Sequence, residues 1–164
     1  MSLRKHLIAS FQNPNDLIDQ YLEDFSDDEM MVRPMEDANH LAWQLGHLIS
    51  LQNYILGQIR PDAMPPLPGG FGERYTKGTS QSDNPADFHT KSEYLSLIKQ
   101  QRNATLRLVE ELSEEELAAD APEAIRPWVN TVGVAIGFVA CTHWLWHAGQ
   151  WIVVRKSLGK PIVV

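Results

Sequence analysis

The amino-acid sequence predicts an all-α protein. Four long stretches repeat apolar side chains at intervals of three and four residues, which is the period of an α-helix. No segment keeps the alternation of apolar and polar residues that a half-buried strand requires, and no internal repeat is present. A chain of 164 residues, 43% of them hydrophobic and 21% charged, is long enough to bury one apolar core. We therefore expect a single domain over residues 1–164.

The first helix is predicted over Leu3 to Phe25. Pro14 is expected to kink or break it near Asn13, because proline lacks an amide hydrogen and clashes with the preceding turn. The second helix is predicted over His40 to Ile59, with Asn39 as its N-cap. One stripe of this helix combines large apolar side chains with two histidines: His40, Trp43, His47, Leu51 and Tyr54.

Prolines and glycines recur between residues 60 and 90 and exclude a long regular element there. A loop of this length in a small domain either crosses over a helical bundle or shapes a site, and the two roles are compatible. The third helix is predicted over Lys91 to Leu112. The acidic run that follows, at residues 114–116, is interpreted as a solvated turn or a short helix start.

Asn130 or Thr131 is expected to cap the fourth helix, which runs to about Leu158 and stops at Gly159 and Pro161. This helix is the most apolar of the four. One stripe of it faces the core and carries two histidines: Ile136, Ala140, His143, His147, Trp151 and Val154.

Charge and cysteine content exclude several classes of function. The formal net charge is −7 and no run forms among the 14 Lys and Arg residues, which argues against a nucleic-acid partner. The single cysteine, Cys141, cannot form an intramolecular disulfide, and we expect it to be buried and inert rather than a reactive thiol. Polar residues come too early for a signal peptide and no apolar run reaches transmembrane length, so we expect a cytoplasmic protein without a membrane partner.

The candidate site is a set of histidines. His143 and His147 stand four residues apart, so that on a helix both imidazoles share one face and can reach one metal ion. His47 is the best third ligand, because it is central in a helix and lies among large apolar neighbours. Its competitor His40 lies near the helix start, where a capping or surface role is expected. The remaining histidines lie in polar segments and are expected at the surface: His6 and His89.

Common catalytic motifs are absent. Positions 144 to 146 are Trp-Leu-Trp, so the glutamate of the His-Glu-x-x-His protease motif is missing. There is no Gly-x-Ser-x-Gly elbow, Walker loop or dinucleotide fingerprint. Proteolysis of that type and phosphate-loop chemistry are therefore disfavoured.

Three motifs together resemble the DinB/YfiT superfamily: Trp43-Gln44-Leu45-Gly46-His47-Leu48, His143-x-x-x-His147-x-Gly-Gln and Leu158-Gly159-Lys160-Pro161. The resemblance implies a four-helix bundle of up-down-down-up topology, with a long crossover between the second and third helices. It implies a metal triad of His47, His143 and His147, and homodimerisation, which is common in the family. Relatives with known activity include thiol-dependent S-transferases and isomerases.

Three neutral imidazoles suit a divalent transition metal, with zinc or nickel as the first choices and iron or copper as alternatives. The sequence thus favours a metal-dependent thiol S-transferase or a related hydrolase that acts on a small thiol or electrophile. Three alternatives stay open: a stress-related bundle with a structural metal, a metal sensor, and a relic site without a reaction. Candidates for pocket or supporting roles around the ligands are Trp43, Gln44, Tyr54, Trp146 and Gln150.

Overall fold

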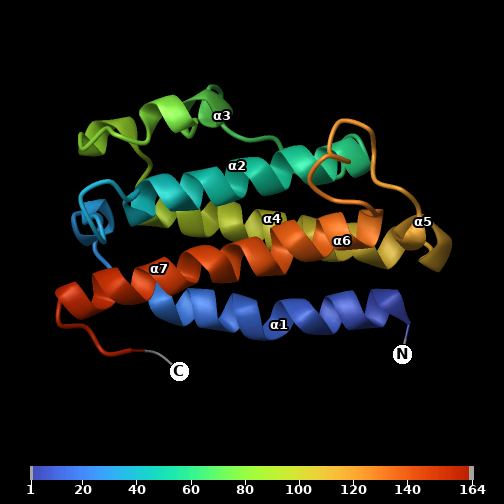
Figure 1. Ribbon diagram of the computed structural model, residues 1–164, viewed down its shortest axis with the longest axis horizontal. Coiled ribbons are helices and arrows are strands. Elements are labelled where there is room, and N and C mark those ends of the chain that lie inside the picture. Colours follow the sequence, from blue (N-terminus) through green and yellow to red (C-terminus); the bar gives the residue numbers. More distant parts are fainter. Residues whose placement is uncertain (1, 163–164) are drawn as a thin grey trace.

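The computed structural model describes residues 2–162, and the regular elements in this range are all helices, with no β-strand. Four long helical segments lie side by side (Figure 1). They are α1 (Leu3–Leu22), α2 (Leu41–Ile59), α4 (Lys91–Glu111) and a last segment built from α6 (Val132–Gly137), the π-helix η4 (Phe138–Thr142) and α7 (His143–Ser157). Short helices occupy the connections: η1 (Glu29–Met31), α3 (Phe71–Arg74), η2 (Lys77–Thr79), η3 (Pro85–Asp87) and α5 (Glu114–Ala118).

The helices run in two directions. In Figure 1, α1 and the last segment run from right to left, whereas α2 and α4 run from left to right. Since α2 and α4 share a direction, the chain between them must return along the molecule, and residues 60–90 do so above α2. Buried apolar side chains form two clusters, one packed around α5 and α6 and the other around α7 and the start of α2. None of the helices between residues 2 and 162 combines the length and apolar character needed to span a bilayer.

The end of α1 and the start of α2 differ from the sequence prediction. The helix α1 continues through the buried Pro14 without the predicted break and ends at Leu22 rather than Phe25. In α2 the N-cap is His40 and not Asn39, because the Nδ1 of His40 accepts a hydrogen bond from the backbone amide of Trp43 at 3.1 Å. A ring nitrogen thus caps this helix, a role that the oxygen of a short polar side chain usually has.

The connection over α2 is anchored by Tyr75. Its ring lies against Gly46, where a Cβ would clash with it. Its hydroxyl is hydrogen-bonded to the hydroxyl of Tyr94 at 2.7 Å and to Nδ1 of His89. The indole of Trp43 adds a second anchor, since its Nε1 donates to the carbonyl oxygen of Thr76 at 3.3 Å. The predicted crossover loop is therefore an ordered layer attached to α2.

The last long segment begins at the predicted cap, because the hydroxyl of Thr131 accepts from the amide of Val134. It is not a uniform α-helix, however. Residues Phe138–Thr142 form a π-helical turn immediately before His143. A π turn holds an extra residue and rotates the side chains that follow relative to those before it. The sequence prediction of one regular helix to about Leu158 missed this turn.

The contact between Gly46 and Tyr75 predicts a stability difference between two glycines of α2. Gly46→Ala should lower the free energy of unfolding by about 1–3 kcal/mol, because the added methyl overlaps the Tyr75 ring. Gly57→Ala is the matched control, since no atom lies within 4 Å of its Cβ position, and it should raise stability by up to about 1 kcal/mol. Urea unfolding followed by circular dichroism measures both, and equal effects would contradict the packing described.

Candidate metal centre

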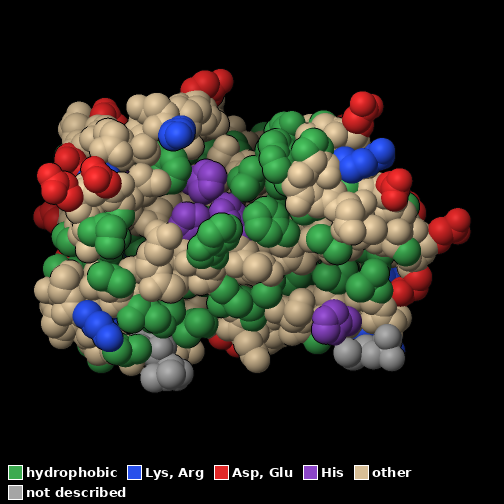
Figure 2. Space-filling model, in the orientation of Figure 1, with side chains coloured by type: hydrophobic (Ala, Val, Ile, Leu, Met, Phe, Trp, Pro, Cys, Tyr) green, Lys and Arg blue, Asp and Glu red, His purple; other side chains and the backbone are tan. Residues whose placement is uncertain are grey.

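Three imidazoles from two helices meet on one face of the molecule. His47 comes from the middle of α2, while His143 and His147 come from the first turns of α7. Histidine side chains gather in a hollow between α2 and α7, open to the viewer in Figure 2. His143 is only 6% exposed and the other two are half-buried. The structure therefore brings together the three residues that the sequence selected.

The spacing of the ring nitrogens fits a shared metal ion. One ligand atom from each imidazole lies within 4.8 Å of the others. The Nε2 atoms of His143 and His147 are 3.2 Å apart. Two nitrogens that bind one tetrahedral zinc at about 2.0–2.1 Å lie roughly 3.4 Å apart, so this pair has the required separation. No other set of three His, Cys, Asp or Glu side chains within residues 2–162 is grouped in this way.

Two of the imidazoles stack on aromatic rings. The ring of His47 stacks on Trp43, with centroids 5.0 Å apart and planes 9° from parallel. The ring of His143 stacks on Phe138 at 5.2 Å and 17°. Phe138 precedes His143 by five residues, a spacing that the π turn makes possible. These contacts limit the rotation of both rings and leave their nitrogens facing the third histidine.

The third imidazole is held by a hydrogen bond. Nδ1 of His147 lies 3.0 Å from Oε1 of Gln44, and Nε1 of Trp151 donates to the same oxygen at 2.8 Å. The amide nitrogen of Gln44 donates to Oε1 of Gln150 at 2.9 Å. Gln44 and Gln150, which the sequence placed around the ligands, thus adjoin His147 directly or through one bond.

Burial keeps the three imidazoles neutral. It is the main cause that lowers the pKa of His143 to about 3 and that of His147 to about 4, and the repulsion that a second charged imidazole would meet lowers both further. Burial also lowers the pKa of His47. Neutral imidazoles carry the lone pairs that a metal ion requires, so the donor set fits a divalent cation at neutral pH.

Other predicted residues lie apart from the cluster or at its edge. His40 is fully buried as the cap of α2, so the surface alternative was wrong, and His89 is half-buried against Tyr75 rather than at the surface. His6 is exposed, as predicted. The side chain of Tyr54 is 46% exposed, and that of Trp146 is 68% exposed with its ring 6.4 Å from His143.

Two residues at the site were not among the candidates. Trp151 could have been found, because it follows His147 by four residues on the same helix face. Phe138 gave no such signal, since five residues do not bring side chains together on a regular α-helix.

Cys141 lies in the π turn and is half-buried, and burial raises the pKa of its thiol. The raised pKa agrees with the predicted low reactivity of this cysteine.

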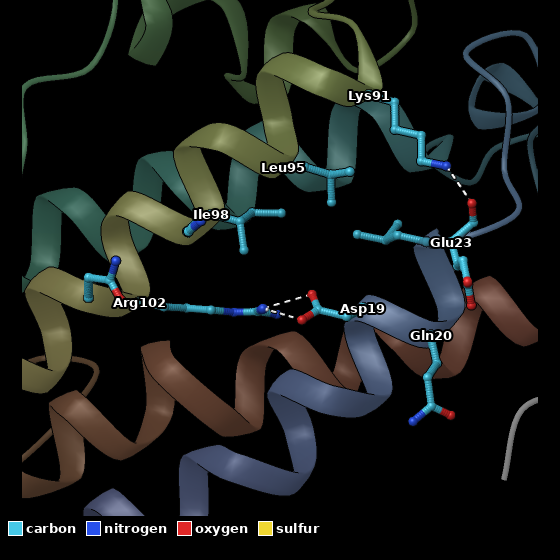
Figure 3. Close-up of a pocket in the computed structure, with 10 residues that line it drawn as sticks. Asp19, Gln20, Glu23, Lys91, Leu95, Ile98 and Arg102 are labelled. Atoms are coloured by element: carbon cyan, nitrogen blue, oxygen red, sulfur yellow. Dashed lines mark hydrogen bonds and ion pairs between the residues drawn. The ribbon is translucent and has the colours of Figure 1, made fainter.

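A second cleft, of about 700 Å³, lies between α1 and α4 (Figure 3). Its floor is apolar, and Arg102 crosses it to bind both carboxylate oxygens of Asp19 at 2.7 and 2.8 Å. Lys91 donates to the backbone oxygen of Glu23 at one end. None of the three clustered histidines lines this cleft, and Arg102 is already paired with Asp19.

The lowered histidine pKa values predict how the metal-free protein responds to acid. Below about pH 6.5, His143 and His147 become protonated in the unfolded chain but stay neutral in the folded protein. The free energy of unfolding should therefore fall as pH falls. The slope should approach about 1.4 kcal/mol per pH unit for each histidine. Urea unfolding between about pH 6.5 and 5.5, above the ordinary carboxylate range, measures the combined contribution of the buried histidines.

A double variant supplies the comparison. His143→Gln with His147→Gln should reduce the slope of the stability profile in that window, because two of the histidines with a lowered pKa are gone while His40, His47 and His89 remain. His6→Gln changes an exposed histidine and should leave the slope as it is. A double variant that keeps the wild-type slope would refute the assignment of the acid sensitivity to the cluster.

Comparison with known proteins identifies the family of the chain. A family model described as the DinB superfamily matches residues 12–150, a range that contains α2, most of α1 and the three clustered histidines. A comparison with curated proteins found no match. The family match covers most of the chain, and the resemblance seen in the sequence motifs is confirmed. The chain belongs to the DinB superfamily.

Proposed function

We propose that the protein binds one divalent transition metal through His47, His143 and His147 and uses it in a thiol S-transfer or a related hydrolysis on a small molecule. The observation that carries the proposal is the convergence of three neutral imidazoles within 4.8 Å of one another. Zinc and nickel are the first choices, because borderline cations suit imidazole nitrogen. A bound cation of this kind would favour the ionised form of a thiol or a water molecule at neutral pH.

The residues of the chain would hold and shield the reacting groups. Trp43 and Phe138 exclude water from one side of the imidazoles, while the hollow in Figure 2 leaves the other side open. In the transfer we propose, the sulfur of a thiol forms a bond to an electrophilic carbon as the bond from that carbon to its leaving group breaks. The thiol proton departs with the leaving group or into solvent through the open side. No protein nucleophile is needed.

A cleft beside His147 supports a small-molecule substrate. It has a volume of about 360 Å³, which falls in the range of small-ligand sites. Its lining combines four apolar and four polar residues, with His147 and Gln150 among the polar ones: Pro34, Met35, Asp37, Ala38, Asn39, His147, Gln150 and Val153. A substrate seated there would have its reacting end beside the imidazoles.

Membership of the DinB superfamily also bears on the order and direction of the helices. We infer the up-down-down-up four-helix bundle of the DinB proteins, with residues 60–90 as its crossover. The two pairs of helix directions in Figure 1 and the position of that connection above α2 support this inference.

The first prediction from this proposal concerns metal content. Protein purified without chelators should contain about one divalent ion per chain by elemental analysis. His47→Ala, His143→Ala and His147→Ala should each lower zinc affinity at least 100-fold, more than the loss of a supporting residue costs. His6→Ala is the control, since its side chain is exposed and remote in sequence from the site. The proposal is wrong if metal-free wild type binds none of zinc, nickel, iron and copper.

The second prediction separates a catalytic metal from a structural one. Chelation should leave the helical circular dichroism signal and cooperative unfolding in place, because two apolar clusters already hold the helices together. A screen of small thiols with electrophiles should show turnover that the wild type supports and His47→Ala loses. Cooperative unfolding on chelation would instead assign a structural role, and equal turnover in the two proteins would exclude the site from the reaction.

A further inference from the structure

Gln44 makes an unusually complete set of hydrogen bonds. It lies on α2 one turn before His47, and its side chain is 1% exposed. Its Oε1 accepts from Nε1 of Trp151 at 2.8 Å and faces Nδ1 of His147 at 3.0 Å. Its Nε2 donates to the backbone oxygen of Asn39 at 2.6 Å and to Oε1 of Gln150 at 2.9 Å. Both ends of the amide are thus occupied inside the protein.

Two of these partners fix which way the amide points. An indole N–H can only donate, so the atom of Gln44 that faces Trp151 must be the oxygen. A backbone carbonyl can only accept, so the atom that faces Asn39 must be the NH₂ group. The orientation of the amide therefore follows from groups that have a single hydrogen-bonding role.

The fixed amide in turn fixes the tautomer of His147. Oε1 of Gln44 carries no hydrogen, so Nδ1 of His147 must donate the hydrogen bond between them. In a neutral imidazole one nitrogen is protonated and the other is not, which leaves a lone pair on Nε2 of His147. That nitrogen is the one that lies 3.2 Å from Nε2 of His143, inside the cluster.

We propose that Gln44, oriented by Trp151, is a positioning residue that selects the Nδ1–H tautomer of His147 and so presents Nε2 as the ligand atom. Outer partners of ligating histidines commonly act in this way. The part about metal affinity rests on the proposed function, whereas the tautomer belongs to the metal-free protein. Without an acceptor at Gln44, both tautomers become accessible to the ring, and one of them directs a hydrogen toward the ion.

The same helix supplies a matched control. Gln52, two turns further along α2, is 4% exposed, and its Oε1 accepts from the indole of Trp144 at 2.9 Å. Its Nε2 donates to the hydroxyl of Thr105 at 3.0 Å. Replacing either glutamine by methionine removes a buried amide and leaves one indole without its acceptor. Only Gln44 also contacts a clustered histidine.

The test compares Gln44→Met and Gln52→Met with wild type by two measurements. Proton–nitrogen NMR of the imidazole rings in metal-free protein reports the tautomer, and competition titration with a chromophoric chelator reports zinc affinity. Wild type should show His147 protonated at Nδ1, and Gln44→Met should lose that single tautomer. Zinc affinity should fall about 10–100-fold in Gln44→Met and stay within about twofold of wild type in Gln52→Met.

Several results would overturn the inference. Wild-type His147 protonated at Nε2 refutes it directly, even if the Gln44→Met protein does not fold. An unchanged tautomer in folded Gln44→Met also refutes it, as does an equal loss of affinity in the two variants. If wild type binds no zinc, the proposed function fails, while the NMR comparison still decides whether Gln44 selects the tautomer.

Discussion

Helices α2 and α7 meet through two buried pairs of an indole and an amide. Gln44 accepts from Trp151, and Gln52 accepts from Trp144. The glutamines are separated by about 12 Å along α2 and the tryptophans by about 10 Å along α7, since each residue of a helix advances 1.5 Å. Two fixed points of this kind determine both the register and the relative direction of the helices. The three histidines lie between or beside them, so their convergence depends on that register.

The connection formed by residues 60–90 is linked to the site through Trp43. Tyr75 can lie against α2 because position 46 has no side chain, and Trp43 both binds Thr76 and stacks on His47. A ring that supports a histidine is therefore also the anchor of the covering layer.

The long helices could be predicted because their apolar periodicity persists over many turns, and α2 ends at Ile59 as expected. His47 could be selected because it is central in its helix and lies among large apolar neighbours, whereas His40 lies near the helix start. Some local features could not be predicted from the sequence pattern. Pro14 stays within α1 although its missing amide hydrogen leaves the carbonyl of Ser10 without its usual helical donor. His40 replaces Asn39 as a cap through its ring, and His89 is half-buried because Tyr75, distant in sequence, folds over it.

The π turn at Phe138–Thr142 lies between the two apolar clusters. Residues before and within it, such as Ile136 and Val139, pack in one cluster, and Trp144 and Trp151 after it pack in the other. The segment is therefore two helices joined in one line, each with its own face toward the core. The first half packs into one apolar cluster, and the second half packs into the other and carries His143 and His147.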